Sequence, residues 1–420
     1  MPMRPCWVEI STRRLEENFR FLLTLAASHA ELLAIVKADA YGHSLGICAP
    51  AAVRAGARWL GVTCVEEGVA ARAVCPEPQI LVIGGAFPGQ GAAVVEHGLS
   101  VVAWEPWQLD ELEGAAHAAG AAAGSVPVHL EIDTGMSRQG VAPEQLHLEA
   151  QEADALARIL ERFTPRSPLR LEGVMTHLFA ADEADGAVTA MQLERLDAAL
   201  GRVGEAGMLP EWLNVGNSAA LLAGQAEKIA GLAARHGMKA LLRPGLALYG
   251  LIPQFNPRFE PQEPPSLTAA RARLQPVLSW KTRVAGVRSI PAGAVVGYNG
   301  TFVATEPMRL ALVAAGYADG LDRRLGNHFS LLVRGVRAPL VGRVSMDQAV
   351  VDVTGIPGVE AGDEVVILGS QSGGSQGRGS QDGGLQGGET ITAFDLAEAT
   401  GTIPWEIFTR IGPRVQRVAI

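Results

Sequence analysis

The sequence predicts a (β/α)8 barrel of the TIM type followed by an all-β C-terminal domain, and three observations support this. The chain has 420 residues, which is long for one hydrophobic core and favours two domains. Between Leu32 and Leu242, short apolar segments alternate with alanine-rich helical segments, as parallel strands alternate with crossover helices. After Leu274, short Val-rich runs separated by Gly and Pro indicate a β domain.

Eight apolar segments are expected to be the strands of the barrel. They are Leu32–Val36, Trp59–Thr63, Ile80–Gly84, Leu99–Trp104, Val128–Asp133, Leu169–His177, Trp212–Asn217 and Ala240–Leu242. The helices expected between most of them are Leu45–Ala57, Val65–Val74, Gln90–His97, Pro106–Ala119, Pro143–Phe163 and Val188–Gly204. A strand at Pro5–Ile10, which could join either domain, comes first, and a helix capped by Ser11 or Thr12 is expected to end near Ala30.

A doubly wound sheet is the alternative for this half of the chain. That fold would need a Gly-rich first turn, for which Gly84–Ala86 is a weak match. The barrel is favoured because polar side chains follow many of the expected strands, and barrel enzymes build their sites at the carboxyl ends of the strands. These polar residues are Lys37, Thr63, Asp133, His177, Asn217 and Arg243.

Three segments describe the expected domain organisation. Residues 1–252 form the barrel, with residues 1–10 free to pair with the β domain; residues 253–273 are a Pro-rich connection; and residues 274–420 form the β domain. The strands expected in the β domain are Leu278–Ile290, Val295–Val303, Met308–Ala314, Phe329–Val333, Ala349–Val353 and Glu364–Leu368. The Gly/Ser/Gln-rich stretch 370–388 can bury almost nothing and predicts a flexible loop, and Ile391–Thr400 predicts a helix capped by Thr392.

Composition excludes several classes of function. The chain has 35 basic and 44 acidic residues, a net charge of −9, which argues against a nucleic-acid partner. No apolar run is long enough to span a bilayer, no basic amphipathic helix is visible, and the first residues lack the apolar core of a signal peptide. The 4 cysteines are too few for a disulfide framework in a chain of this length, which predicts reduced thiols and a cytoplasmic location.

Lys37 stands at the carboxyl end of a buried apolar strand, Leu32–Val36. Burial disfavours the charged form of an amine and lowers its pKa, which suits a nucleophile or a base. The alternative is a lysine that extends its amine from the strand end into water. The context favours chemistry, because Ala34–His43 (AIVKADAYGH) closely resembles the pyridoxal-phosphate lysine segment of bacterial alanine racemases, a fold type III family. The resemblance implies that Lys37 holds pyridoxal 5′-phosphate as a Schiff base and that Tyr41 reaches the cofactor phosphate.

A second segment, Glu131–Arg138, allows two interpretations. His129, Glu131 and Asp133 share one face of the expected strand, which invites a metal site, but no fourth ligand is visible and no metal is expected. The segment also resembles the racemase segment whose arginine, here Arg138, lies near the cofactor phenolic oxygen and the substrate carboxylate. Many relatives have a carbamate-bearing lysine where this chain has Glu131. We expect the Glu131 carboxylate to orient the arginine without modification.

Three further segments resemble racemase cofactor contacts. Thr176–His177 implies that His177 lies beside the cofactor and is hydrogen-bonded to Arg243. Asn217 and Ser218, after the seventh strand, match the phosphate position of many barrels, and the resemblance adds the backbone N–H groups of Gly245 and Leu246. The resemblance assigns Arg243 to the pyridine nitrogen. Because arginine does not release its proton, it would keep that nitrogen unprotonated and weaken the ring as an electron sink.

Two segments of the β domain also resemble the family. In Gly316–Gly320 the resemblance implies that Tyr317 is the second catalytic base, and in Gly342–Gln348 it implies that Met346 contacts substrate, followed by the supporting residue Asp347. Because these residues are implied to enter the site from the other subunit, the resemblance implies a homodimer with shared active sites. Lys37 would serve the D face and Tyr317 the L face. A tyrosine of ordinary pKa, about 10, needs help to act as a base, and a His177–Arg243 chain would supply it.

The resemblance runs from Trp7 to Arg417 and implies an alanine racemase that supplies D-alanine for peptidoglycan. Ile411–Arg414 departs from relatives that have an entrance tyrosine there, which leaves a broad-specificity amino-acid racemase as an alternative. A pyridoxal-phosphate decarboxylase lacks support, because neither its Gly-rich phosphate loop nor a cysteine beyond Cys75 is present. A non-catalytic pyridoxal-phosphate carrier would be a lone barrel, without a β domain.

Overall fold

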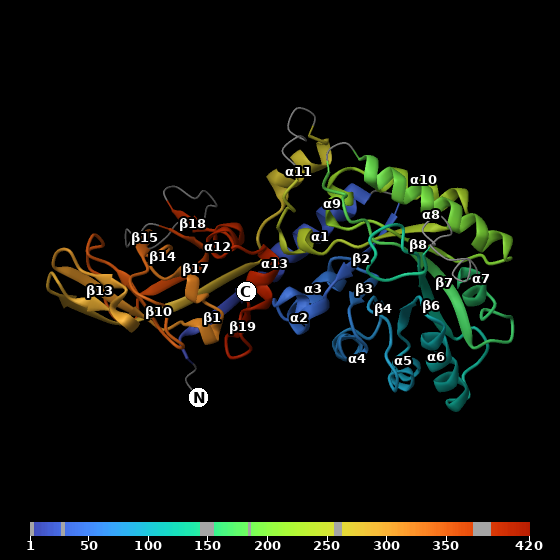
Figure 1. The fold of residues 1–420 in the computed structure, drawn as a ribbon, viewed down its shortest axis with the longest axis horizontal. Coiled ribbons are helices and arrows are strands. Elements are labelled where there is room, and N and C mark those ends of the chain that lie inside the picture. The colour runs from blue at the N-terminus through green and yellow to red at the C-terminus, as the bar shows by residue number, and fades with distance from the viewer. Residues whose placement is uncertain (1–3, 27–29, 143–154, 184–185, 256–262, 373–387) are drawn as a thin grey trace. The chain divides into compact units, whose positions relative to one another are not determined.

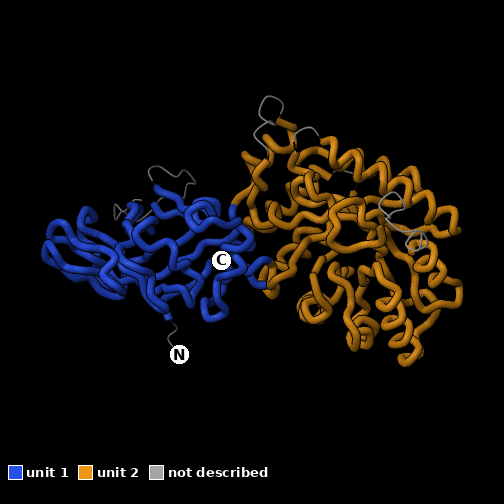
Figure 2. Tube along the Cα trace, in the orientation of Figure 1, with its two compact units in different colours: residues 1–12, 41–44, 276–420 blue, residues 13–40, 45–275 orange. Residues whose placement is uncertain are grey.

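The computed structural model describes residues 4–26, 30–142, 155–183, 186–255, 263–372 and 388–420. The chain divides into two compact units, coloured separately in Figure 2. Unit 1 comprises residues 1–12, 41–44 and 276–420, and unit 2 comprises residues 13–40 and 45–275. The short segment Tyr41–Ser44 therefore belongs with the C-terminal unit, although Lys37, four residues before Tyr41, belongs to unit 2.

Unit 2 is a closed parallel barrel in the order β2-β3-β4-β5-β6-β7-β8-β9 (Figure 1). The barrel strands are β2 Ala30–Ile35, β3 Trp59–Val62, β4 Gln79–Val82, β5 Ser100–Ala103, β6 Val126–Glu131, β7 Leu169–Met175, β8 Trp212–Asn214 and β9 Lys239–Leu242. The strands are rich in fully buried Leu, Ile and Val, as expected of parallel strands covered on both faces. The (β/α)8 expectation is confirmed in the described residues.

The helices of unit 2 surround the barrel. They are α1 Thr12–Ala26, α3 Leu45–Arg54, α4 Val65–Val74, α5 Gly91–Glu96, α6 Pro106–Ala118, α7 Ala155–Leu160, α8 Ala187–Glu205, α9 Ser218–Leu222, α10 Ala226–Arg235 and α11 Pro265–Arg273. Helix α11 makes the later part of the expected Pro-rich connection helical, because Pro265 suits the first turn of a helix. The first half of the expected helix Pro143–Phe163 lies outside the described residues. No helix in the described parts of the chain is long and apolar enough to cross a membrane.

Unit 1 is built on an antiparallel-rich sheet that runs in the order β15-β14-β17-β10-β1-β19, with β13, β16 and β18 attached to it. Its strands are β1 Cys6–Ile10, β10 Leu278–Ile290, β13 Met308–Val313, β14 Ser330–Val333, β15 Val336–Pro339, β16 Ala349–Asp352, β17 Glu364–Gln371, β18 Glu389–Ile391 and β19 Gln416–Ala419. The N-terminal strand β1 pairs antiparallel with β10 and parallel with β19. Both ends of the chain thus contribute to this sheet.

Two details of unit 1 differ from the sequence expectations or refine them. The expected strand Val295–Val303 is two short strands, β11 Val295–Val296 and β12 Phe302–Val303, because the turn Tyr298–Gly300 interrupts it. Asn299 in that turn has φ 63, a conformation incompatible with a continuous strand. The expected helix cap is present, since the Thr392 hydroxyl accepts a bond from Asp395 N at the start of α12 Ala393–Thr400. Most of the Gly/Ser/Gln-rich stretch, residues 373–387, lies outside the described residues.

His129 belongs to a buried cluster of polar side chains on the barrel strands, together with Glu172 and Ser100. Its Nε2 lies 3.3 Å from Glu172 Oε2, and the Ser100 hydroxyl donates to the same oxygen at 2.6 Å. Burial alone would raise the pKa of Glu172, but His129, Ser100 and Arg170 together lower it to about 2. His129 therefore pairs with a carboxylate. Within the described residues, no three His, Cys, Asp or Glu side chains converge as metal ligands.

We predict that Glu172→Gln lowers the free energy of unfolding by about 3 kcal/mol at neutral pH, because it removes a buried carboxylate whose charged form the folded protein stabilises. A carboxylate whose pKa falls on folding, here to about 2, stabilises the protein above its ordinary pKa of 4.5. The difference between the wild type and the variant should therefore shrink as pH falls from 4.5 towards 2, in urea unfolding across this range. Arg170→Met is the control: Arg170 pairs with the same carboxylate but is half-exposed, so its loss should cost less than about 1 kcal/mol.

Candidate active site

Lys37 lies two residues beyond the end of β2, at the carboxyl edge of the barrel. Two hydrogen bonds fix the chain just before it: Val36 N donates to Gly61 O at 2.8 Å, and the Tyr249 hydroxyl donates to Ile35 O at 2.8 Å. Burial lowers the pKa of Lys37, and the positive charges of Arg138 and Arg243 lower it further. An amine in this position becomes neutral, and so nucleophilic, more readily than an exposed lysine.

The segment after Lys37 is a left-handed turn that precedes α3. Four successive residues, Ala38 to Tyr41, have φ between 51 and 56. Such a backbone costs roughly 1–2 kcal/mol for each non-glycine residue, so the surrounding structure must hold it. Glu67 accepts a bond from Ala38 N at 2.6 Å, and Asp39 Oδ1 accepts one from Leu45 N at 2.6 Å where α3 begins. The turn fixes the backbone between Lys37 and Tyr41.

Arg243, directly after β9, is a buried guanidinium that joins the ends of three strands. Its Nη1 donates to the backbone and side-chain oxygens of Asn214 at 2.7 and 2.6 Å. Its Nη2 donates to Thr176 O at 3.0 Å and to His177 Nδ1 at 3.1 Å. These four bonds use the four Nη hydrogens, and Nε–H is the donor that remains.

The contact between Arg243 and His177 determines the protonation of the imidazole ring of His177. Arginine can only donate, so Nδ1 of His177 accepts and carries no proton. Burial lowers the pKa of His177, and the neighbouring charges of Arg243, Arg138 and Lys37 bring it to about 3. Burial also lowers the pKa of Arg243 to about 10, which leaves it protonated at neutral pH. The hydrogen bond expected between these two residues is present.

Glu131, the last residue of β6, is buried beside two arginines. Burial raises its pKa to about 7, although a hydrogen bond from Gln139 and the charges of Arg243 and Arg138 oppose the rise. Gln139 also donates to Ile83 O at 3.3 Å, which fixes its amide against the end of β4. The sequence analysis missed Gln139; its position one residue after Arg138 was the available signal.

Hydrogen bonds from the backbone to the Asp133 side chain hold the loop from Asp133 to Arg138. Asp133 Oδ1 accepts bonds from Gly135 N at 2.9 Å and Ser137 N at 3.1 Å. Thr134 and Thr176 share a buried hydroxyl–hydroxyl bond of 2.8 Å, which ties the loop after β6 to the end of β7. Arg138 is exposed, and its charge lowers the pKa of Lys37, His177 and Glu131. It therefore lies close to all three.

Asn217 and Ser218 form the start of α9. The Asn217 side chain caps the helix by accepting from Ala220 N at 3.0 Å, and it donates to Leu178 O at 3.3 Å. The Ser218 hydroxyl accepts from Gly245 N at 3.0 Å and from Ala247 N at 3.2 Å. The turns after β8 and β9 are therefore joined, and Leu246 lies within the second of them.

The remaining predicted residues belong to unit 1. Tyr317 lines a pocket of about 720 Å³ together with Tyr298, Gly320, Asp322, Arg323, Val344 and Arg410. The side chains of Tyr317 and Met346 are 42% and 53% exposed. Tyr298, which the sequence analysis missed, is 66% exposed on the same pocket. Its signal was the flanking Gly297 and Gly300, which mark a turn inside a segment that we interpreted as a strand.

Comparison with known proteins gives the family. The sequence model described as alanine racemase, N-terminal domain, matches residues 10–253, and the one described as alanine racemase, C-terminal domain, matches residues 277–419. The chain belongs to the alanine racemase family. It is 38% identical to an alanine racemase of Symbiobacterium thermophilum over 417 residues, which cover 99% of this chain and 97% of that protein. The family membership, the fold and the isomerase class predicted from the sequence are confirmed.

Two solved alanine racemases have similar structures. The Bacillus anthracis enzyme with bound L-Ala-P has a TM-score of 0.81 and 31% identity, and the match covers 100% of this chain and 96% of that one. The Bartonella henselae enzyme with covalently bound pyridoxal phosphate has a TM-score of 0.75 and 27% identity, and the match covers 99% of both chains. The predicted cofactor is thus that of the alanine racemase family.

We predict that Glu131 acts as a carboxylate that orients Arg138. With a pKa raised to about 7, Glu131 loses its charge as pH falls through neutrality. In the wild type, kcat/KM for amino-acid substrate should therefore fall on the acid side of pH 7, and Glu131→Gln should lack this limb. Steady-state pH profiles of both proteins measure the effect. Gln139→Leu, which removes the neutral donor to Glu131, should shift the limb to higher pH; a Glu131→Gln profile identical to the wild type would contradict the assignment.

Proposed function

We propose that the chain interconverts L-alanine and D-alanine with pyridoxal 5′-phosphate, through two bases on opposite faces of the substrate. The observation that carries the proposal is the pairing of a depressed-pKa amine, Lys37, with the buried, permanently charged Arg243 at the same end of one barrel. Family membership supports the same activity. When bound, the cofactor makes the α-proton of an amino acid acidic.

The residues of the barrel fit the cofactor. Lys37 offers an amine for covalent attachment, and Arg243 offers its remaining Nε–H to the pyridine nitrogen. Because Arg243 keeps its proton, it leaves that nitrogen unprotonated. The first-turn N–H groups of α9 that the Asn217 cap leaves available, the N–H group of Leu246 and the Ser218 hydroxyl form the proposed phosphate site, and Gly245 supports it because its N–H donates to Ser218 Oγ. Asn217 holds this helix start in place through its cap.

Two side chains are proposed to move the α-proton. Lys37 removes it from one face of D-alanine or returns it there, and a tyrosine of the unit-1 pocket acts on the other face. The resemblance to the family implies that this tyrosine is Tyr317; Tyr298 shares the pocket and is the competing candidate. Arg138 is proposed to hold the substrate carboxylate as a planar donor pair, with Met346 contacting substrate and Asp347 supporting it.

The wider context of the proposal is a cytoplasmic homodimer that supplies D-alanine for peptidoglycan. Exposure of Tyr298, Tyr317 and Met346 on unit 1 supports a surface that a second copy of the chain completes. None of the four cysteines, all of which lie in the described residues, forms a disulfide, and burial raises the pKa of Cys6 to about 11, so this thiol is unreactive and suits a reducing compartment.

The deciding experiment is chiral analysis of products after the cofactor-loaded protein is incubated separately with L-alanine, L-serine and L-lysine. We predict that D-alanine is the dominant product and that Lys37→Ala forms none, because it lacks both the attachment point and one base. Lys37→Ala should also leave no borohydride-reducible adduct with the cofactor, which tests the attachment independently of activity. Comparable formation of D-serine or D-lysine would indicate a broad-range racemase. Release of an amine would indicate a decarboxylase. Cofactor binding without any turnover would indicate a non-catalytic carrier.

A pair of variants separates the two tyrosines. If Tyr317 is the second base, Tyr317→Phe should lower kcat by about 10²–10⁴-fold, the usual contribution of a positioned acid or base, while Tyr298→Phe retains most activity. Both variants keep the aromatic ring and remove only the hydroxyl, so a difference between them reflects the loss of the hydroxyl and not a loss of ring packing. Measurement of kcat with L-alanine and with D-alanine is sufficient. The reverse pattern would transfer the role to Tyr298.

A further inference from the structure

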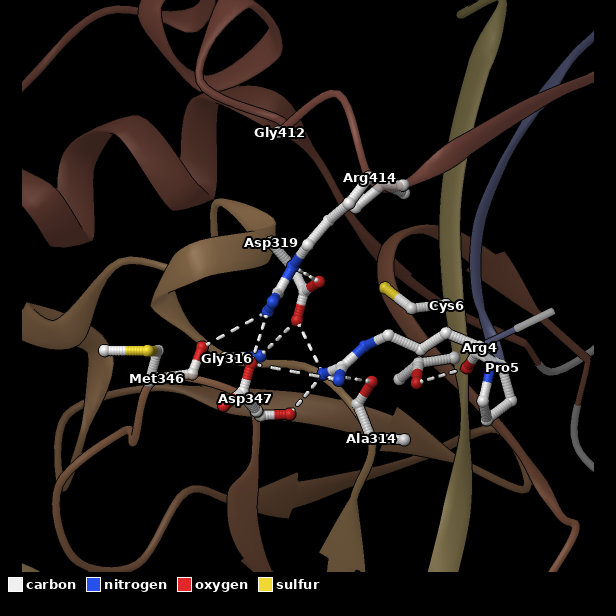
Figure 3. Close-up of polar contacts among 12 residues, drawn as sticks. Arg4, Pro5, Cys6, Ala314, Gly316, Asp319, Met346, Asp347, Gly412 and Arg414 are labelled. Atoms are coloured by element: carbon white, nitrogen blue, oxygen red, sulfur yellow. Dashed lines mark hydrogen bonds and ion pairs between the residues drawn. The ribbon is translucent and has the colours of Figure 1, made fainter.

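The carboxylate of Asp319 in unit 1 is fully buried and is held by two arginines from opposite ends of the chain. Arg4 Nη2 donates to Asp319 Oδ2 at 2.9 Å, and Arg414 Nε donates to Asp319 Oδ1 at 2.7 Å. The side chain of Asp319 is 0% exposed, whereas those of Arg4 and Arg414 are about one-third exposed. Figure 3 shows the two guanidinium groups reaching the carboxylate from different elements. A buried carboxylate needs such partners to remain charged.

Asp319 also closes the turn that carries Tyr317. It is the last residue of the short 3-10 helix Tyr317–Asp319, and its Oδ2 accepts a bond from Gly316 N at 2.8 Å. The same oxygen therefore contacts both the start of the turn and Arg4. Because the carboxylate cannot move without breaking these bonds, it fixes the backbone of the turn that carries Tyr317.

The two arginines hold the Met346–Asp347 loop at the same time. Arg414 Nη2 lies 2.8 Å from Asp347 Oδ1, and Arg4 donates to the backbone oxygen of Asp347. The backbones of the loop and the turn are joined directly, since Ala318 N donates to Met346 O at 2.9 Å. Two positive and two negative side chains thus meet around the contact between the turn and the loop, as Figure 3 shows.

There is no space for the two segments to slide past one another. A Cβ atom at position 316 would overlap the backbone oxygens of Ser345 and Met346, so glycine is required for this close approach. Tyr317 N donates to Ser345 O at 3.0 Å, which fixes the register. The ion-paired cluster and the backbone contacts therefore hold one arrangement of Tyr317 relative to Met346.

We propose that Arg4 and Arg414 are positioning residues for racemisation, which hold Tyr317 and Met346 in place through Asp319 and Asp347. The inference rests on the proposed function, because Tyr317 and Met346 matter to catalysis only if the pocket takes part in the reaction. Each arginine is proposed to act by holding a carboxylate of the protein, and not by contacting the substrate.

The test compares Arg4→Met and Arg414→Met with the matched control Arg337→Met. Arg337 is also a half-exposed arginine of unit 1 that pairs with a carboxylate, Glu389 at 3.1 Å, and with a backbone oxygen, but it does not line the pocket. Each cofactor-loaded protein is incubated with D-alanine in D2O. NMR measures α-proton exchange in the remaining D-alanine, and chiral analysis measures formation of L-alanine.

We expect Arg4→Met and Arg414→Met to lower kcat for racemisation by about tenfold or more, as small displacements of catalytic groups do. The ratio of exchange to racemisation should rise severalfold, because Lys37 still exchanges the α-proton of D-alanine while delivery to the other face is impaired. Arg337→Met should resemble the wild type, and Arg414→Lys, which keeps the charge but not the planar fork, should recover part of the loss.

A merely structural role predicts a different result. Loss of folded or cofactor-loaded protein would lower exchange and racemisation by the same factor, and an unchanged ratio in both variants would overturn the proposal. If the methionine variants do not fold, Arg4→Lys and Arg414→Lys are tested for the same ratio. Wild-type protein that forms no D-alanine from L-alanine would overturn the proposed function and this inference together, whereas an active wild type with unchanged variant ratios overturns the inference alone.

Discussion

The site of unit 2 depends on the buried guanidinium of Arg243. A charge removed from water is stable only when its donors are satisfied, and here Arg243, at the end of β9, finds its partners at the ends of β7 and β8. Those bonds fix the carboxyl edges of β7, β8 and β9 relative to one another. They also require His177 to accept through Nδ1, so one buried cation determines both the geometry of the edge and the protonation of its imidazole.

Local strain lies next to this edge, in the left-handed turn after Lys37. Four non-glycine residues in that conformation are unfavourable by themselves, and the compensation comes from elsewhere in the barrel. Glu67, in the first turn of α4, accepts bonds from Ala38 N and from Thr63 N at 2.8 Å. One carboxylate therefore links the ends of β2 and β3 and holds the strained backbone. This explains how the short turn after Lys37 keeps its left-handed backbone although Ala38 to Tyr41 include no glycine.

Sequence reasoning succeeded where local pattern and structure coincide. Alternating apolar and helical segments gave the barrel, and polar residues after the strands gave Lys37, His177 and Arg243, because parallel strands bring their carboxyl ends to one edge. The left-handed turn was not predictable, since Ala38–Tyr41 contains no glycine and its stability comes from Glu67 and Asp39. The partnership of Arg4 with Asp319, 315 residues apart, was equally invisible because only the sheet pairing of unit 1 brings these segments together.

Each unit contains a buried charged side chain, and the two charges have opposite signs. In unit 2 a buried cation, Arg243, donates its hydrogen bonds to neutral acceptors; in unit 1 a buried anion, Asp319, is held by cations. In each case the desolvated charge allows few arrangements of its neighbours, because any partner that moves leaves a buried charge unsatisfied. The exposed side chains beside them, Arg138 in unit 2 and Tyr317 and Met346 in unit 1, need no such constraint of their own. In each unit, a rigid buried charge therefore lies close to the exposed side chains that we propose as functional groups.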